Sequence, residues 1–381
     1  MLTYYFKTIG AFGGYTQGGG HSPLSSLHGL GADQVLAIEI VTPDGTFLSA
    51  NADENSDLFW AIRGGGGGTF GVVTSMVVKA YPDLGATTAT FSIDAGSMDL
   101  TNDTFWAAFD AFFSHFPRFV KAGAYSYIHT FPGPKPVLNI GPFFAPGKNV
   151  AEVEDLTAPF LDDLKGLGID LQPNWTEYKG FHEAWGASFP LELVEGVRFA
   201  SSSRLWPRGN WDDGGPKFRA MMDAIRYGVE RGYVLNGFHF SPTVEAAGVG
   251  IDDSAVNPAW RDTYCHLIAG MAWDEGLTAE EQMDMRHDFT NVHMKKWRDA
   301  SPGAGSYMNE ADRLEPNFQQ SFFGSHYEKL LSIKKKYDPE DLMWAVTAVG
   351  SDSWAVKSVD GLPNENGKLC RVQTPSESCS V

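Results

Sequence analysis

The sequence predicts an α+β fold whose strands run antiparallel to one another. A hairpin pattern comes first and is followed by a short helix and a further strand. From residue 83 to residue 300, strand-like runs then alternate with long helical runs, and no internal repeat divides the chain. A chain of 381 residues, of which 43% are hydrophobic and 20% charged, has the composition of a folded protein with a large core.

The first elements are a hairpin, a helix and a strand. A turn of sequence PDG separates two strand-like runs that begin at Val35 and Thr46. The following NSDLFWAI predicts a short helix with Asn55 or Ser56 as its N-cap. Residues 72–79 alternate between two faces, a pattern typical of a strand.

The second region mixes strands with longer helices. Five phenylalanines between residues 105 and 116 fall on one helical face, and Thr278 with Glu281 forms a capping box that opens a helix extending to Arg298. The stretch GPFFAPGKN imitates a phosphate-binding loop, but its spacing and its final Asn predict a strand-to-helix loop instead. Further helices are expected at residues 149–165 and 217–231, and strands at 124–131, 136–144, 197–204, 233–241 and 262–273.

The last region begins with a basic helix within SHYEKLLSIKKKYDPEDLMW, which ends before Pro339. The polar, Gly- and Ser-rich sequence beyond it predicts a loose terminus. Cys265, Cys370 and Cys379 lack the C-x-x-C spacing of a zinc or redox motif. Cys370 and Cys379 could pair with each other, or one of them with a partner outside this chain.

Charge and composition exclude several functions. The formal charge of −18 is spread along the chain, which disfavours nucleic acid or an anionic membrane as the main partner. No apolar run reaches the length of a membrane span, and the first residues as written contain no signal peptide. Two Asn-x-Thr sequons, at Asn102 and Asn174, would accept glycans in a secreted protein. The aromatic content of 13% suits either walls for a ring-shaped ligand or core packing.

Two glycine clusters are the main local signals. Gly66, Gly68 and Gly71 match the G-x-G-x-x-G spacing, but the order helix, glycines, strand is the reverse of a Rossmann phosphate turn. The run of five glycines at 64–68 therefore favours close approach by a ligand over a simple tight turn. His21 follows another glycine run and is either a polar loop residue or a donor beside a bound anion or ring. Hydrolase motifs and closely spaced histidine pairs are absent from the sequence, so no metal site is predicted.

Several stretches together resemble one family. DLFWAIRGGGGGTFGVVTSMVVKAYP, NPAWRDT, YMNEAD and KKYDPEDLMWAVTAVGS are similar to the fungal FAD-linked oxidases of the berberine-bridge and 6-hydroxynicotine oxidase group, in particular to isoamyl alcohol oxidase-like members. These have the vanillyl-alcohol oxidase (VAO) type of flavin fold. The resemblance extends over residues 8–372.

The resemblance implies a domain plan. Residues 1–82 would be the C-terminal half of an FAD-binding domain of the PCMH type, and residues 83–300 a substrate domain with an antiparallel sheet backed by helices. Residues 301–381 would be a berberine-bridge-type segment that returns to the FAD domain. Family members carry another half of the FAD domain, with the histidine that bonds the flavin, ahead of the matching part. We therefore expect this chain to lack that half, and His21 is not that histidine.

The resemblance also implies a reaction: hydride transfer from an alcohol-type or other small organic substrate to FAD, followed by reoxidation with O2, in a protein that is extracellular when full length. Two alternatives are a catalytically dead fragment unable to hold FAD, and a secreted ligand-binding or interaction protein. By the same resemblance, Tyr307 is a base of lowered pKa or a substrate anchor, and His266 is the next candidate base. The residues implied to line FAD are Gly14, Tyr15, Gly19, Gly20, His21 and Asn309 near the flavin, Gly71 and Val72 near the adenosine half, and His326, where the family usually has Asn.

Overall fold

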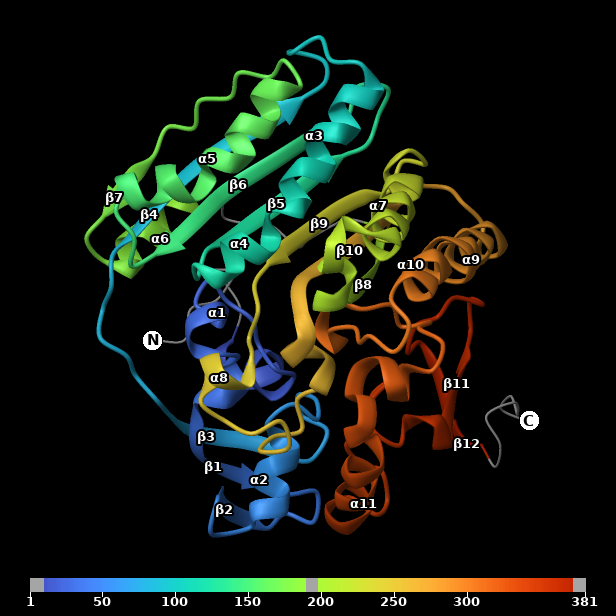
Figure 1. The fold of residues 1–381 in the computed structure, drawn as a ribbon. Helices are drawn as coiled ribbons and strands as arrows, with labels where there is room; N and C mark the ends of the chain where they lie inside the picture. The colour runs from blue at the N-terminus through green and yellow to red at the C-terminus, as the bar shows by residue number, and fades with distance from the viewer. Residues whose placement is uncertain (1–9, 190–197, 373–381) are drawn as a thin grey trace.

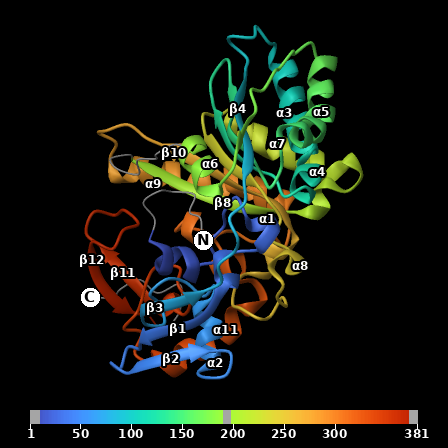
Figure 2. The same cartoon turned by 90° about the vertical axis from the view of Figure 1, so that its left-hand side faces the viewer.

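The computed structural model describes residues 10–189 and 198–372, and these ranges form an α+β fold (Figure 1). The antiparallel arrangement predicted from the sequence is confirmed for every strand pair within them. Figures 1 and 2 both place a large sheet with its helices at one end of the molecule and a small sheet at the other. The boundaries drawn after residues 82 and 300 remain predictions.

The small sheet contains the predicted hairpin and the strand that follows the glycines. Its order is β2-β1-β3, with β1 at Val35–Val41, β2 at Phe47–Asn51 and β3 at Val72–Val78. Helix α2 (Ser56–Ile62) begins after Asn55, as predicted, but the Asn55 side chain donates to the Ser49 carbonyl instead of capping the helix. A three-stranded sheet of this size needs cover, because its inner face is apolar.

The large sheet has the order β7-β4-β6-β5-β9-β10-β8. Its strands are β4 (Ala86–Asp94), β5 (Tyr125–Phe131), β6 (Val137–Pro146), β7 (Thr176–Tyr178), β8 (Phe199–Pro207), β9 (Val234–His239) and β10 (Thr263–Ala272). Strand β6 therefore includes most of GPFFAPGKN, and only its last residues form the predicted loop before the next helix. The strand predicted at residues 136–144 is confirmed, and the predicted loop was wrong for Ala145 and Pro146, because pairing with β4 continues to Pro146.

Four helices, α3, α4, α5 and α7, cover one face of the large sheet (Figure 1). The α-helices other than α2 are α1 (Ser25–His28), α3 (Asn102–Ser114), α4 (Phe116–Lys121), α5 (Val150–Gly166), α6 (Phe181–Ser188), α7 (Pro216–Val229), α8 (Val244–Ala247), α9 (Ala279–Asp288), α10 (Met294–Ala300) and α11 (Tyr327–Tyr337). No helix within the described residues is long and apolar enough to span a membrane. The capping box of Thr278 and Glu281 opens α9 as predicted.

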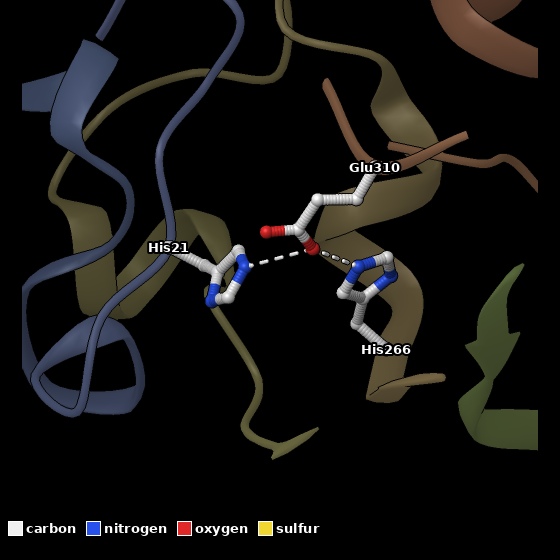
Figure 3. A group of neighbouring side chains, drawn as sticks. All are labelled: His21, His266 and Glu310. Atoms are coloured by element: carbon white, nitrogen blue, oxygen red, sulfur yellow. Dashed lines mark hydrogen bonds and ion pairs between the residues drawn. The ribbon is translucent and has the colours of Figure 1, made fainter. Parts of the chain in front are cut away.

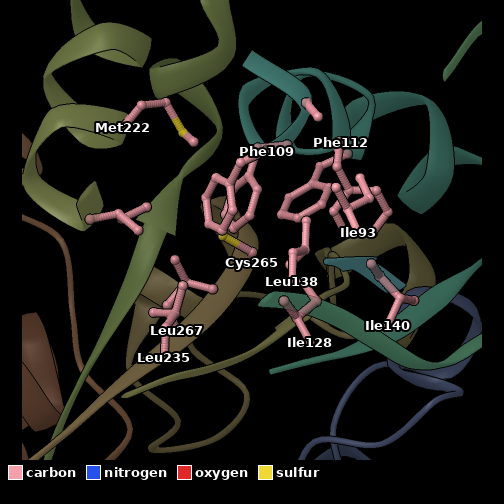
Figure 4. Close-up of a cluster of buried hydrophobic side chains, with 14 of the residues drawn as sticks. Ile93, Phe109, Phe112, Ile128, Leu138, Ile140, Met222, Leu235, Cys265 and Leu267 are labelled. Atoms are coloured by element: carbon pink, nitrogen blue, oxygen red, sulfur yellow. The ribbon is translucent and has the colours of Figure 1, made fainter. Parts of the chain in front are cut away.

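The largest core lies between the large sheet and helices α3, α4, α5 and α7 (Figure 4). The five phenylalanines predicted to share a helical face are all fully buried there. Inward-facing side chains of the strands, such as Ile128, Leu235 and Leu267, complete the core. Because side chains alternate along a strand, their neighbours Tyr127, Asn236 and His266 must project from the opposite face of the sheet.

The C-terminal region packs back on the small sheet. Phe322, Leu330 and Ile333 join the core that β1, α2 and Phe70 form. Lys334 is buried in α11 and donates to Asp338 Oδ2, 2.6 Å away, and to the Thr69 and Met343 carbonyls. All three N–H donors of this buried ammonium group are therefore satisfied. The bond to the Thr69 carbonyl connects α11 with the end of the glycine run.

The expectation of a loose terminus after α11 was wrong for part of that segment. Residues Trp354–Ser358 (β11) pair with Gly367–Arg371 (β12) in a hairpin. Cys370, on β12, is disulfide-bonded, and Cys265 is a buried free thiol. Cys379 lies outside the described residues. The sequence did not predict this hairpin because neither strand has a buried face, so the alternation of apolar and polar residues that marks a half-buried strand is missing.

His293 is a buried histidine between helices α9 and α10. Its ring packs 4.7 Å from that of Tyr233, and neither ring nitrogen has a hydrogen-bond partner among the described residues. Burial, followed by the charges of Arg231 and Lys296, lowers the pKa of His293 from 6.5 to about 4. The folded protein therefore holds this imidazole in its neutral form at neutral pH.

Acidification is expected to destabilise the protein through His293. In the unfolded chain the imidazole takes up its proton near pH 6.5, whereas the folded protein resists until about pH 4. The free energy of unfolding should therefore fall, by on the order of 3 kcal/mol, as the pH is lowered through this window. Denaturant unfolding at several pH values measures the slope. His293→Phe should reduce the slope without abolishing it, because burial also lowers the pKa of His239, to about 3; an unchanged slope would contradict the assignment.

Candidate functional site

The two glycine clusters meet and form one surface of bare backbone. A Cβ on Gly67 would lie 2.6 Å from the Cα of Gly14, so the two segments touch at these residues. Gly13, Gly14, Gly67 and Gly68 are exposed. Gln17 connects the two segments through hydrogen bonds. Its carbonyl accepts from the backbone N–H groups of Gly64 and Gly66, and its side-chain Oε1 accepts from the Gly68 N–H at 3.2 Å.

Most of the second cluster serves packing within the protein, which corrects the interpretation of the whole run as a ligand approach. A Cβ on Gly64 would lie 2.2 Å from the Val256 nitrogen, and one on Gly71 would lie 2.6 Å from the Val41 oxygen. Both glycines also have positive φ, at 119° and 152°. Only Gly67 and Gly68 combine bare backbone with exposure.

His21 lies in a loop, as one of the two alternatives had it, but its side chain is buried in a box of aromatic rings. Its ring centroid lies 4.8 Å from that of Phe238, 5.3 Å from Phe240 and 6.1 Å from Trp260. The Tyr15 hydroxyl donates to the His21 carbonyl at 2.9 Å and thereby fixes the loop. A Cβ on Gly20 would collide with the Tyr15 ring at 2.7 Å, which explains the glycine there.

Glu310 joins His21 to His266 (Figure 3). Its Oε2 atom lies 2.7 Å from Nε2 of His266 and 3.4 Å from Nε2 of His21. His266 is fully buried on β10, whereas 19% of the Glu310 side chain is exposed at the end of the turn Met308–Glu310. Among the hydrogen bonds of the described residues none involves Oε1, so this oxygen is the atom of the cluster that an incoming molecule can reach.

Tyr307 and Asn309 connect this cluster to the glycine surface. Asn309 Nδ2 donates to the Tyr307 hydroxyl and to the Gly14 carbonyl, both at 2.8 Å. The Tyr307 ring is buried and stands edge-on to His21 and His266, with centroid distances of 5.6 and 5.8 Å. A Cβ on Gly19 would touch both Tyr307 and Trp260 at 3.9 Å.

The electrostatics of the cluster favour the ionised form of Glu310. Burial alone would raise the pKa of Glu310, but the charges and hydrogen bonds of His21 and His266 more than offset this, so its pKa is lowered. Burial lowers the pKa of His266, although Glu310 acts in the opposite direction. The pKa of Tyr307 is raised by burial and by Glu310, which contradicts the lowered value expected from the sequence.

Hydrogen bonding explains the cluster better than a metal ion does. His21, His266 and Glu310 each offer a ligand atom, and these atoms lie within 4.8 Å of one another. However, the 2.7 Å between His266 and Glu310 is a charge-assisted hydrogen-bond distance. Two ligands of one zinc ion, each about 2.0–2.1 Å from it, would lie about 3 Å or more apart.

The predicted residues fall into two groups. Gly14, Tyr15, Gly19, Gly20, His21, His266, Tyr307 and Asn309 lie together around the cluster. Gly71 and Val72 begin β3, where Val72 is 56% exposed and Gly71 packs against β1. His326 lies 3.1 Å from Asp252, whose side chain is 82% exposed, and packs against Trp60 of the small-sheet core, so it lies away from the cluster.

Sequence reasoning missed Glu310 and Trp260. Glu310 directly follows Asn309 in YMNEAD, so a carboxylate within an already suspected motif was the available signal. Trp260 lies in NPAWRDT and places its ring 5.1 Å from that of Tyr307. Nothing in the spacing links these residues to His21, because they are more than 200 positions away from it along the chain.

Comparisons with known proteins agree with this arrangement. Residues 306–350 match the family model for "Berberine and berberine like" proteins. The chain is 35% identical to the FAD-linked oxidoreductase ZEB1 of Gibberella zeae, over 96% of this chain and 61% of that protein. It is 34% identical to the FAD-linked oxidoreductase patO of Aspergillus clavatus, again over 96% of this chain and 61% of that protein.

A solved structure shares the fold over nearly the whole chain. The VAO-type flavoprotein MtVAO615 of Myceliophthora thermophila superimposes with a TM-score of 0.84 at 31% identity, covering 98% of this chain and 65% of that one. The architecture is therefore that of a VAO-type flavoprotein. Over nearly its whole length the chain is thus similar to berberine-bridge-like FAD-linked oxidoreductases of fungi. It spans about 61% of the length of the curated relatives described above.

Proposed function

We propose that this protein acts as an FAD-dependent oxidase that removes a hydride from an alcohol-type carbon of a small organic substrate, with O2 as the final acceptor. The observation that supports this most strongly is the Glu310 carboxylate, which two imidazoles hold inside an aromatic box. One of its oxygens remains open on the side of the cluster that solvent reaches. Proton removal is the task that alcohol oxidation leaves to the protein.

The residues present fit FAD. Planar rings and an extended chain need bare backbone to lie against, and Gly13, Gly14, Gly67 and Gly68 offer a continuous exposed stretch of it. Asn309 fixes the end of this stretch next to Tyr307. We propose that these glycines, with Tyr15 and His21 behind them, hold the flavin. Bound FAD would supply the acceptor for the hydride.

The chain's own residues supply the proton acceptor. As the substrate loses hydride from carbon, its hydroxyl becomes strongly acidic, so a carboxylate of lowered pKa is a sufficient base. Glu310 Oε1 takes this proton, and the carbon–oxygen bond becomes a carbonyl. His21 and His266 keep Oε2 in place throughout.

Tyr307 is proposed as a substrate anchor, the second of the two roles that the resemblance implies. A phenol whose pKa is raised stays protonated and can donate to a substrate oxygen. Tyr307→Phe keeps the ring and is expected to slow flavin reduction by no more than about ten-fold, the value of one neutral hydrogen bond. Stopped-flow flavin reduction measures this. A loss of a thousand-fold would instead identify Tyr307 as the base.

The proposed function is tested with the purified protein supplied with FAD. We expect the visible absorption bands of a bound flavin, and we expect benzyl alcohol or another primary alcohol to bleach them without oxygen. Admission of O2 should restore the bands with formation of peroxide. A flavin that binds but that no alcohol reduces would contradict the proposal, as would absence of flavin binding.

We also propose an extracellular location. Asn102 and Asn174, the two sequon asparagines, are both exposed, and Cys370 is disulfide-bonded. Expression through a fungal secretory pathway is expected to yield protein whose mass falls on treatment with an endoglycosidase. Replacing both asparagines by Gln should abolish that shift. Protein that carries no glycan when secreted would count against the proposal.

A further inference from the structure

The hairpin of β11 and β12, dark red in Figure 1, contributes residues 354–358 to the wall of a cavity of about 420 Å³. The other walls come from the segments 313–318, 344–352 and 362–364. Pockets for small molecules commonly measure about 300–1,000 Å³, so this cavity has room for one. The Glu310 cluster does not line it, so the cavity is separate from the proposed flavin site.

Two tryptophans give this cavity aromatic walls. The Trp354 indole N–H donates to Asp341 Oδ2 at 2.8 Å, and the Trp344 indole N–H donates to the Ser351 carbonyl at 3.2 Å. Arg371 lies over one face of the Trp354 ring, 5.3 Å from its centroid, and does not line the cavity, so the cavity meets this ring on another side. Both rings are half-exposed and fixed by the protein, which makes them a rigid platform for a ligand.

Two of the walls contain strained backbone. Thr347 lines the cavity with a φ of 57°, in the left-handed region that a β-branched residue rarely adopts. Asn317, with a φ of 55°, directly precedes Phe318, whose ring is part of the apolar lining. Residues held in such conformations concentrate at sites that bind ligands, and here they lie on two different segments of one cavity.

The charged groups of the lining nearly cancel. Arg313 donates from Nη2 to Glu365 Oε1 at 2.5 Å, and Glu315 lies 3.2 Å from Arg298. Nε and Nη1 of Arg313 make no hydrogen bond with the described residues, so they can donate to a ligand. Asp352 is exposed and in no ion pair among the described residues, so its carboxylate can accept. A ligand with a net charge of either sign would meet a like charge at Arg313 or at Asp352.

We propose that this cavity binds a neutral saccharide. A pyranose ring with equatorial hydroxyls has an apolar C–H face, which packs on the tryptophan rings. Its rim of hydroxyls both donates and accepts, so it can accept from Arg313 and donate to Asp352. Aromatic walls with both donors and acceptors suit such a molecule better than an ion or a purely apolar compound. The proposal does not depend on the oxidase function.

Isothermal titration of the full chain with cellobiose tests the proposal. We expect a Kd below about 1 mM. Sorbitol, a polyol without a ring face, should bind at least ten-fold more weakly, and tetramethylammonium, the probe for a cation in an aromatic cage, should not bind. Equal affinity for cellobiose and sorbitol, binding of tetramethylammonium in place of cellobiose, or no binding of cellobiose would overturn the proposal.

Two variants place the sugar in this cavity. Trp344→Ala is expected to weaken cellobiose binding about ten-fold. Asp352→Asn, an exposed change that should not disturb folding, is expected to weaken it about five-fold and decides the matter if Trp344→Ala does not fold. The matched controls are Phe47→Ala, which removes a ring 57% exposed on β2, and Asp284→Asn, which changes an exposed carboxylate on α9. Equal effects of the controls, or an unchanged affinity in Asp352→Asn, would contradict the proposal.

Glu310→Gln separates this cavity from the flavin site. It should leave cellobiose binding unchanged, because Glu310 does not line the cavity. Binding that Glu310→Gln abolishes and Trp344→Ala spares would place the sugar at the flavin site and overturn the proposal. Binding that Trp344→Ala weakens, in a protein whose flavin no alcohol reduces, would support the saccharide site and contradict the oxidase.

Discussion

Glu310→Gln is expected to slow reduction of the flavin by an alcohol about 10²- to 10⁴-fold, the usual value of a general base. The amide has the size of the carboxylate and can still accept from His266 at one oxygen, but it cannot take up the substrate proton. The affinity for substrate should change much less than the rate. Stopped-flow reduction at saturating alcohol separates the two effects.

Controls exclude a structural cause for that loss. Glu39→Gln changes an exposed carboxylate on β1 in the same way and should leave the rate unchanged. Glu310→Ala should be partly rescued by added formate, a response that misfolding would not produce. Because the pKa of Glu310 is lowered, the parent should keep its rate below the pH at which ordinary carboxyl groups protonate. A Gln variant within a few-fold of the parent would show that Glu310 is not the base.

The fold followed from the sequence where local signals were strong. Three elements are determined by residues close together in the sequence. These are the hairpin of β1 and β2, the phenylalanine face of α3 and the capping box of α9. The β11–β12 hairpin was not predicted, because neither of its short strands has a buried face. The last two residues of β6, Ala145 and Pro146, were also missed, since pairing with β4 is a contact between distant segments.

The site was predictable only in part, for a related reason. His21, His266 and Tyr307 could be singled out by their motifs, but their common partner Glu310 becomes visible only when β10, the first glycine cluster and the turn Met308–Glu310 are brought together. The raised pKa of Tyr307 likewise depends on burial and on Glu310. Gly64 and Gly71 show a different kind of error. The sequence correctly indicated that glycine is required at these positions, but the reason is close packing within the protein and not the approach of a ligand.

The segments that carry the cluster are joined by a buried ion pair. Arg261 Nη2 and Nη1 donate to Asp33 Oδ1 and Oδ2 at 2.7 and 2.8 Å, and the Asp33 and Arg261 side chains are 0% and 5% exposed. The Leu30 backbone N–H also donates to Asp33, and Pro242 accepts from Arg261. Asp33 follows the His21 loop and Arg261 follows Trp260, so the pair fixes two walls of the aromatic box.

Asp33→Asn is therefore expected to lower the free energy of unfolding by about 3–5 kcal/mol, because it leaves the guanidinium buried without a counter-charge. Arg261→Met should lower the free energy of unfolding by a similar amount, because it leaves the Asp33 carboxylate buried without a counter-charge. The double variant Asp33→Leu/Arg261→Met should cost less than either single change, since no buried charge remains. Asp299→Asn, which breaks the Lys295–Asp299 pair that is 61% exposed on both sides, is the control and should cost no more than about 0.5 kcal/mol. Urea unfolding of the four variants measures these differences. A cost below about 1 kcal/mol for Asp33→Asn would show that the two walls are held by packing, and the His21 ring should then keep its place against Trp260 without the ion pair.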